Sequence, residues 1–186
     1  MKPSWRYTEE SEEHLLELGR AGNEDAFFEL YRRYESAVFR FALHMSGRRE
    51  IAEEVVQEVF LALLSRDCAY SADRGTLEAF LIGTARNQVR RHQRDAQRTG
   101  SSEVPELFQE PEDYVGRDEE LLALRRAVLS LPERYRAVSV LCDLEERSYA
   151  EAAAQLGIAV GTVRSRLHRA HAILESKMRG RDRCPA

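Results

Sequence analysis

The 186-residue sequence has few cysteines and no long apolar run. Its three cysteines, Cys68, Cys142 and Cys184, lie far apart and are odd in number. This excludes a disulfide scaffold and is typical of a reducing cytoplasm. The longest unbroken apolar run is six residues, 59–64, whereas a membrane-spanning helix needs about 18 or more. The amino-terminal residues are polar and acidic, so we expect no secretory signal and a cytoplasmic protein.

The sequence also lacks the motifs of common enzyme classes. It contains no H-E-x-x-H, no G-x-x-x-x-G-K-[ST] phosphate loop and no C-x-x-C pair. His168 and His171 are three residues apart, but no cysteine lies near them before Cys184. Surface polar residues explain this pair better than a metal site does. We therefore expect no catalytic residue, no metal and no cofactor.

The net charge of −4 conceals a block pattern. Residues 1–85 carry −6, residues 86–98 carry +4, residues 99–124 carry −7 and residues 125–186 carry +5. Basic segments attract polyanions, of which nucleic acid is the commonest. Solvated helix faces would explain either basic segment taken alone. Two basic segments on either side of an acidic one favour a nucleic-acid partner.

Apolar residues recur at helical spacing through most of the chain, and no stretch alternates with period two for long enough to predict a strand. The spacing predicts helices over 24–45, closed by Gly47, over about 51–63 and over about 76–97. The third helix ends in a cluster of arginines, part of which the helix dipole explains. Residues 99–120 are rich in Gly, Ser, Pro and acids, which predicts a flexible linker.

The carboxy-terminal third predicts a helix-turn-helix. Pro132 can open a helix that continues to about Leu144. Ser148 and Glu151 match a capping box at the start of a helix over 149–156, which stops at Gly157. A second helix begins near residue 160 and would be the recognition helix. Its outward side chains can donate to phosphates, and arginines can reach guanine edges. An ordinary helical hairpin with a solvated polar face is the alternative.

These residues resemble a known family. The strings L-P-E-R-Y-R-A-V at 131–138 and S-Y-A-E-A-A-A-Q-L-G-I-A-V-G-T-V-R-S-R-L-H-R-A at 148–170 are similar to region four of the extracytoplasmic-function (ECF) sigma factors. These proteins belong to the sigma-70 class of bacterial transcription initiation factors. A-F-F-E-L-Y-R-R-Y at 26–34, A-E-E-V-V-Q-E-V-F-L-A-L-L at 52–64 and A-R-N at 85–87 resemble region two.

The resemblance implies an all-α protein with two small helical domains joined by a flexible acidic linker. Region two would occupy residues 1–98, the linker 99–124, and region four, with the helix-turn-helix, 125–186. Residues 52–64 would form the helix that binds the clamp coiled coil of the largest subunit of core RNA polymerase. Its candidate contacts are Glu53, Glu54, Gln57 and Glu58, although a plain solvated face would carry the same residue types.

The two promoter elements would be bound by different regions. Region two would face the −10 element, which in the family is melted with one base held out of the stack. This requires aromatic or apolar pockets and cations along the strand. The expected −10 contacts are Phe80, Arg86, Asn87, Arg90 and Arg91. The expected contacts to the duplex −35 element are Thr162, Arg164, Ser165, Arg166 and Arg169.

The resemblance also suggests a further partner, and one of the departures from the family pattern lies in region four. Many family members are inhibited by an anti-sigma factor that covers both domains, so such a protein is a candidate partner. Glu146 stands where the family usually has glycine, in the turn before Ser148.

A stand-alone helix-turn-helix repressor or activator is the alternative function. Such a protein would have no need of a polymerase-binding helix.

Overall fold

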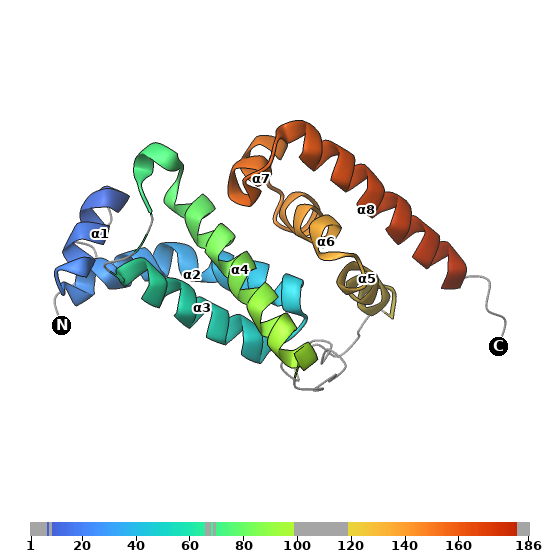
Figure 1. The fold of residues 1–186 in the computed structure, drawn as a ribbon, viewed down its shortest axis with the longest axis horizontal. Coiled ribbons are helices and arrows are strands. Elements are labelled where there is room, and N and C mark those ends of the chain that lie inside the picture. The colour runs from blue at the N-terminus through green and yellow to red at the C-terminus, as the bar shows by residue number, and fades with distance from the viewer. Residues whose placement is uncertain (1–6, 8, 66–67, 69, 99–118, 182–186) are drawn as a thin grey trace.

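The computed structural model describes residues 7, 9–65, 68, 70–98 and 119–181, and only the backbone at 119–122 and 180–181. All regular elements in these residues are helical (Figure 1). In these ranges no helix is both long and apolar enough to span a membrane. The elements are α1 (Glu12–Arg20), α2 (Glu24–Ser46), α3 (Arg49–Leu64), the 3-10 turn η2 (Ala72–Arg74), α4 (Leu77–Arg98), α5 (Glu119–Leu129), α6 (Glu133–Ser139), the π-helical segment η3 (Val140–Leu144), α7 (Tyr149–Leu156) and α8 (Val160–Arg181).

The first group of helices, α1 to α4, is built around α2. Asn23 caps the start of α2, where its side chain accepts a hydrogen bond from the backbone N–H of Ala26 at 3.1 Å. Gly47 ends the helix in the left-handed conformation, as predicted, with φ 73°. Helix α3 runs back along α2, because Phe60 lies beside Tyr31 with ring centroids 4.8 Å apart while Arg49 lies over the ring of Phe39.

The second group, α5 to α8, contains the predicted helix-turn-helix. Ser148 and Glu151 form both bonds of the capping box, and α7 ends at Gly157 with φ 63°. Helix α8 then follows and buries Val163, Leu167 and Ala170, which lie three or four residues apart along one face. The motif therefore has the boundaries predicted from its cap, turn and apolar spacing.

One predicted helix differs in its second half. The helix opened by Pro132 stays α-helical only to Ser139, and the segment that follows, Val140–Leu144, is π-helical. The backbone N–H of Glu145 bonds to the carbonyl of Val140 at 2.9 Å, one residue further back than in an α-helix. Glu146 then adopts φ 53°, a left-handed conformation that glycine adopts more readily.

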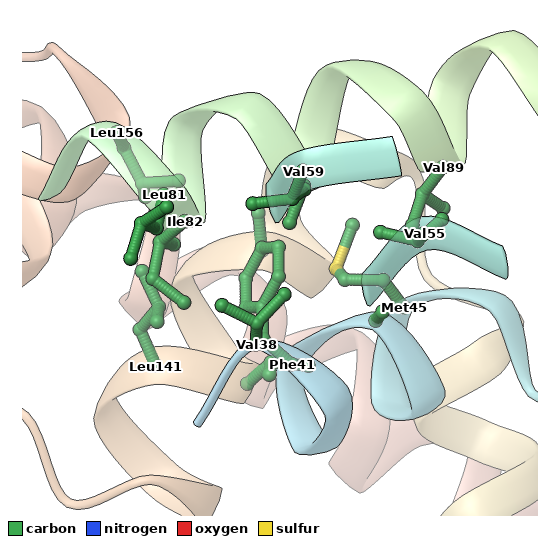
Figure 2. Close-up of a cluster of buried hydrophobic side chains, with 14 of the residues drawn as sticks. Val38, Phe41, Met45, Val55, Val59, Leu81, Ile82, Val89, Leu141 and Leu156 are labelled. Atoms are coloured by element: carbon green, nitrogen blue, oxygen red, sulfur yellow. The ribbon is translucent and has the colours of Figure 1, made fainter. Parts of the chain in front are cut away.

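The two groups pack against each other and share one apolar core (Figure 2). In that core Leu81 and Ile82 of α4 lie near Leu141 of η3 and Leu156 of α7. Helix α4 contacts α7, and α2 contacts α5, α6 and η3. Arg136 of α6 donates to the backbone carbonyl of Met45 at 2.6 Å, near the carboxyl end of α2. The two predicted domains are therefore in direct contact in this conformation.

Bounds for two of the helices were not predicted from the sequence. Helix α1 is only nine residues long, too short for a clear period, yet it buries Leu15 and Leu16. Helix α5 begins at Glu119, so residues 119–124 are helical and the predicted linker ends earlier than expected. The acids at the start of α5 resemble the acidic linker in composition, and this hid its amino-terminal turn. The rest of the predicted linker, 99–118, lies outside the described residues.

Candidate functional site

The outward face of α8 carries the residues predicted for the −35 element. Arg164, Ser165 and Arg169 are exposed, and Thr162 and Arg166 are partly exposed. Burial of Val163, Leu167 and Ala170 on the opposite side fixes this orientation. Because α8 continues to Arg181, the exposed face begins at the turn and extends along a helix of 22 residues.

A cavity of about 270 Å³ lies between this face and α6. It brings four of the five predicted −35 residues together, whereas Arg164 does not line it. Two residues of α6 that were not predicted from the sequence also line it, Arg134 and Tyr135. A hydrogen bond from Arg169, together with the nearby Arg134 guanidinium, lowers the pKa of Tyr135 below its usual range. Among the described residues, the lining consists of Arg134, Tyr135, Thr162, Ser165, Arg166 and Arg169.

The predicted −10 residues lie on α4, and three of them line a second cavity of about 430 Å³. Phe80, Arg86 and Asn87 line this cavity, as do the segment 70–76 and the end of α7, residues 154–157. The Phe80 ring lies 5.5 Å from the ring of Tyr70, so two aromatic side chains meet at one edge. Tyr70 was not predicted, because the segment before α4 carries no periodic signal.

Three arginines of α4 already have partners inside the chain. Arg86 Nε donates to Glu133 of α6 at 2.8 Å, and Arg90 Nε lies 3.5 Å from the other oxygen of the same carboxylate. Arg91 is exposed and lies 3.9 Å from Asp95 on its own helix. Arg90 and Arg91 do not line the cavity, and the Glu133 carboxylate of α6 neutralises part of the basic cluster on α4.

The predicted polymerase-binding residues share the exposed side of α3. Glu53 pairs with Arg49 at 2.8 Å, and Gln57 is exposed. Glu54 and Glu58 flank His92 of α4, at 3.5 Å and 3.2 Å from its two ring nitrogens.

Leu61 extends the same face, although in the sequence it lies within an apolar run. Its side chain is 70% exposed, and its position seven residues after Glu54 puts it on the same side of the helix. Helical spacing from Glu54 and Gln57 was the signal that could have found it.

Comparisons with known proteins match both halves of the chain. Residues 30–99 match the family model for sigma-70 region 2, and residues 121–174 match the model for sigma-70 region 4. The chain is 38% identical to the ECF RNA polymerase sigma factor SigE of Mycolicibacterium smegmatis over 149 residues, which cover 76% of this chain and 57% of SigE. It is 33% identical to the ECF sigma factor SigL of Mycobacterium tuberculosis over 145 residues, which cover 75% of this chain and 81% of SigL.

A solved structure has a similar fold. The sigma factor RpoE of Bartonella quintana, in complex with the anti-sigma factor NepR, superposes with a TM-score of 0.64 at 25% identity. The superposition covers 82% of this chain and 96% of RpoE. The two region models occur in order on the two helix groups that carry the candidate surfaces, and the chain belongs to the ECF sigma factors of the sigma-70 family of transcription initiation factors.

Proposed function

We propose that this chain binds core RNA polymerase through the exposed face of α3 and directs it to promoters through α4 and α8. The observation that supports this most is the division of the surface between the two helix groups. Helix α3 presents the three predicted acids, Gln57 and an exposed leucine, whereas α8 presents arginines beside an open cavity. An acidic patch suits a basic protein partner, and a basic patch suits DNA phosphates.

Promoter recognition would be shared between the two basic helices. Helix α8 would enter the major groove of the −35 element, with Thr162, Arg164, Ser165, Arg166 and Arg169 as contacts. Helix α4 would bind the melted −10 strand through Phe80, Arg86, Asn87, Arg90 and Arg91. The cavity at Phe80 and Tyr70 has aromatic edges on which an unstacked base can lie. Two weak sites held on one polymerase act together through effective concentration.

The described conformation fits a form that precedes promoter binding. Arg86 and Arg90 share the carboxylate of Glu133, and α7 covers one side of the cavity beside Phe80. A DNA strand on α4 would have to displace α6 and α7. Binding of each helix group to a separate place on polymerase would supply that separation.

Several further properties follow from this role. The chain would have no catalysis of its own and would act in the cytoplasm, where bacterial polymerase acts. Its relative RpoE was solved with an anti-sigma factor, so a protein of that class is a candidate partner here. A stand-alone regulator is not favoured, because it leaves the match to region 2 without a purpose.

Co-elution of the purified chain with bacterial core polymerase on a sizing column tests the proposal. A one-to-one complex that initiates run-off transcription from genomic promoter fragments is the expected result. No complex, together with footprinting of a palindrome by the chain alone, would overturn it in favour of a stand-alone regulator.

A further inference from the structure

Arg134 and Tyr135 of α6 lie against the recognition helix rather than against the rest of the chain. Tyr135 is buried in a small apolar cluster with Leu131 and Ala170, and this cluster attaches α6 to α8. The guanidinium carbon of Arg134 lies 4.8 Å from the centroid of the Tyr135 ring, a cation–π distance. Burial of Tyr135 therefore fixes where the exposed Arg134 stands relative to α8.

The cavity at this junction has the composition of an anion site. Among the residues that the structure describes, three arginines and three hydroxyl groups line it, and no acid does. In the described part of the chain, none of Arg134, Arg166 and Arg169 forms an ion pair with a carboxylate. This contrasts with Arg86, whose charge is matched by Glu133. Three like charges around a void repel one another, so an anion between them would lower the energy of the arrangement.

The chemistry of these groups selects a phosphate. A guanidinium presents paired donors that match two phosphate oxygens, and hydroxyl groups add further donors. The effect of the arginines on the pKa of the Tyr135 hydroxyl shows that this part of the cavity is electropositive.

The position of the cavity selects a phosphate of duplex DNA over a free ion. The cavity opens beside the leading end of the predicted recognition helix, where Thr162 and Ser165 stand. In helix-turn-helix proteins the recognition helix lies in the major groove, so residues beside it face the phosphates that border the groove. Helix α6 packs against α8 (Figure 1), which places Arg134 beside that helix.

We propose that Arg134 and Tyr135, together with Arg166 and Arg169, bind one backbone phosphate of duplex DNA and so set the register of α8 in the groove. This proposal rests on the proposed role of α8. It gives the basic residues different roles, because Arg164 lies outside the cavity and is left to read base edges. Phosphate contacts of this kind position a protein without reading sequence.

The site is accessible while the two helix groups are in contact. Glu133 points to α4, whereas its neighbour Arg134 is exposed on the side of α8. Duplex binding through the phosphate site therefore needs no separation of the groups, and the full chain can be tested without polymerase.

The test measures affinity of the full chain for a labelled mixed-sequence duplex of about 30 base pairs by fluorescence anisotropy, over a range of NaCl concentrations. The logarithm of the binding constant falls with the logarithm of salt in proportion to the phosphates contacted. We expect Arg134→Gln to reduce this slope by about one and to weaken binding about three- to tenfold. Tyr135→Phe keeps the apolar cluster and should weaken binding about twofold, by loss of one hydroxyl.

The matched control is Arg179→Gln, which removes the same charge from α8. Arg179 is 81% exposed, pairs with Glu175 and lies outside the cavity. The salt dependence of duplex binding by Arg179→Gln should therefore equal that of the wild type. Circular dichroism melts check that each variant folds. The phosphate site would be overturned if the salt dependence of duplex binding in Arg134→Gln equalled that of the wild type. It would also be overturned if Arg134→Gln and Arg179→Gln lost the same duplex affinity.

Further measurements distinguish a DNA phosphate from a free phosphate ion, and failure of the phosphate site from failure of the proposed function. The first adds inorganic phosphate at constant ionic strength. DNA would be overturned as the ligand if phosphate raised the melting temperature of the wild type but not of Arg134→Gln, while both proteins showed the same salt dependence of duplex binding. No salt-dependent binding of any duplex by the wild type would also overturn the site. Failure to co-elute with polymerase would overturn the proposed function, while the slope comparison would still decide the phosphate site.

Discussion

Glu133 accepts a hydrogen bond from Arg86 Nε at 2.8 Å, although the two residues lie 47 positions apart in the sequence. The same carboxylate lies 3.5 Å from Arg90 Nε. Both arginines are predicted contacts of the −10 strand, and a carboxylate offers them the oxygens that a phosphate would. The region-four helix α6 thus occupies part of the predicted nucleic-acid face of region two.

Glu133→Gln should therefore increase binding of single-stranded DNA by the free chain. The side chains are 19% and 28% exposed, and a pair of this exposure contributes about 0.5–1 kcal/mol, equivalent to about two- to fivefold in affinity. The measurement is anisotropy with a labelled thymidine oligonucleotide, because stacking and phosphate contacts tolerate any base.

The control for that prediction is Glu145→Gln. Glu145 pairs with Arg40 at 3.0 Å between the same two helix groups, away from the predicted −10 residues. If both variants gain the same affinity for single-stranded DNA, the cause is separation of the helix groups rather than release of Arg86. If neither gains, Glu133 does not compete with DNA.

The sequence predicted individual helices well because their signals are local. The capping box at Ser148, the glycines at the ends of α2 and α7, and the stripe through Val163 are each set by residues within a few positions. The outward face of α8 follows from that stripe, so the exposure of the predicted −35 residues could also be predicted.

The packing of one helix group on the other could not be predicted in the same way. It depends on Leu156 meeting Leu81 and on Arg136 reaching the carbonyl of Met45, 91 positions away. No local period encodes such pairs. For the same reason the partner of Arg86 and the place of Arg134 beside α8 emerge only in three dimensions.

Charge reversal on α3 should weaken polymerase binding. Glu54→Lys with Gln57→Lys places two cations on the predicted docking face, and like charges against a basic partner surface should cost about 2–4 kcal/mol, or roughly 30- to 1000-fold in affinity. Affinity for core polymerase is measured by competition with a labelled sigma factor. Glu17→Lys on the exposed side of α1 is the control and should bind normally. Loss of duplex binding by the double variant as well would indicate misfolding instead of a lost docking surface.

Glu146→Gly should stabilise the protein. Glu146 has φ 53°, a conformation that destabilises the folded state by about 1–2 kcal/mol when the residue carries a side chain. Glycine removes this strain, but its greater freedom in the unfolded chain opposes folding by about 0.5–1 kcal/mol. The net gain of about 0.5–1 kcal/mol should raise the melting temperature by about 1–4 °C. Gly157→Ala is the reciprocal test: its φ is 63° with no atom within 4 Å of an added Cβ, so strain alone should lower the melting temperature. An unchanged or lower value for Glu146→Gly would contradict the presence of strain at this position.

His44 should make the protein less stable in mild acid. Burial lowers the pKa of His44, and Arg125 and Arg40 act in the same direction, while the Glu145 carboxylate 4.0 Å away opposes them. The unfolded chain therefore binds a proton at His44 before the folded chain does, once the pH falls through about 6.5. Stability is then lost as the pH decreases, by about 1.4 kcal/mol for each unit of pKa depression.

His44→Gln removes this group, so between pH 7.5 and 5.5 its melting temperature should fall less than that of the wild type. His14→Gln removes a histidine that is half exposed on α1, and the two variants experience the same changes at all other sites. The difference between the melting-temperature losses of His44→Gln and the wild type therefore measures the effect of His44, and His14→Gln shows the effect of removing an exposed histidine. Equal losses in His44→Gln and the wild type would show that protonation of His44 carries no cost in the folded state, and a larger loss in His44→Gln would mean that its protonation stabilises the fold.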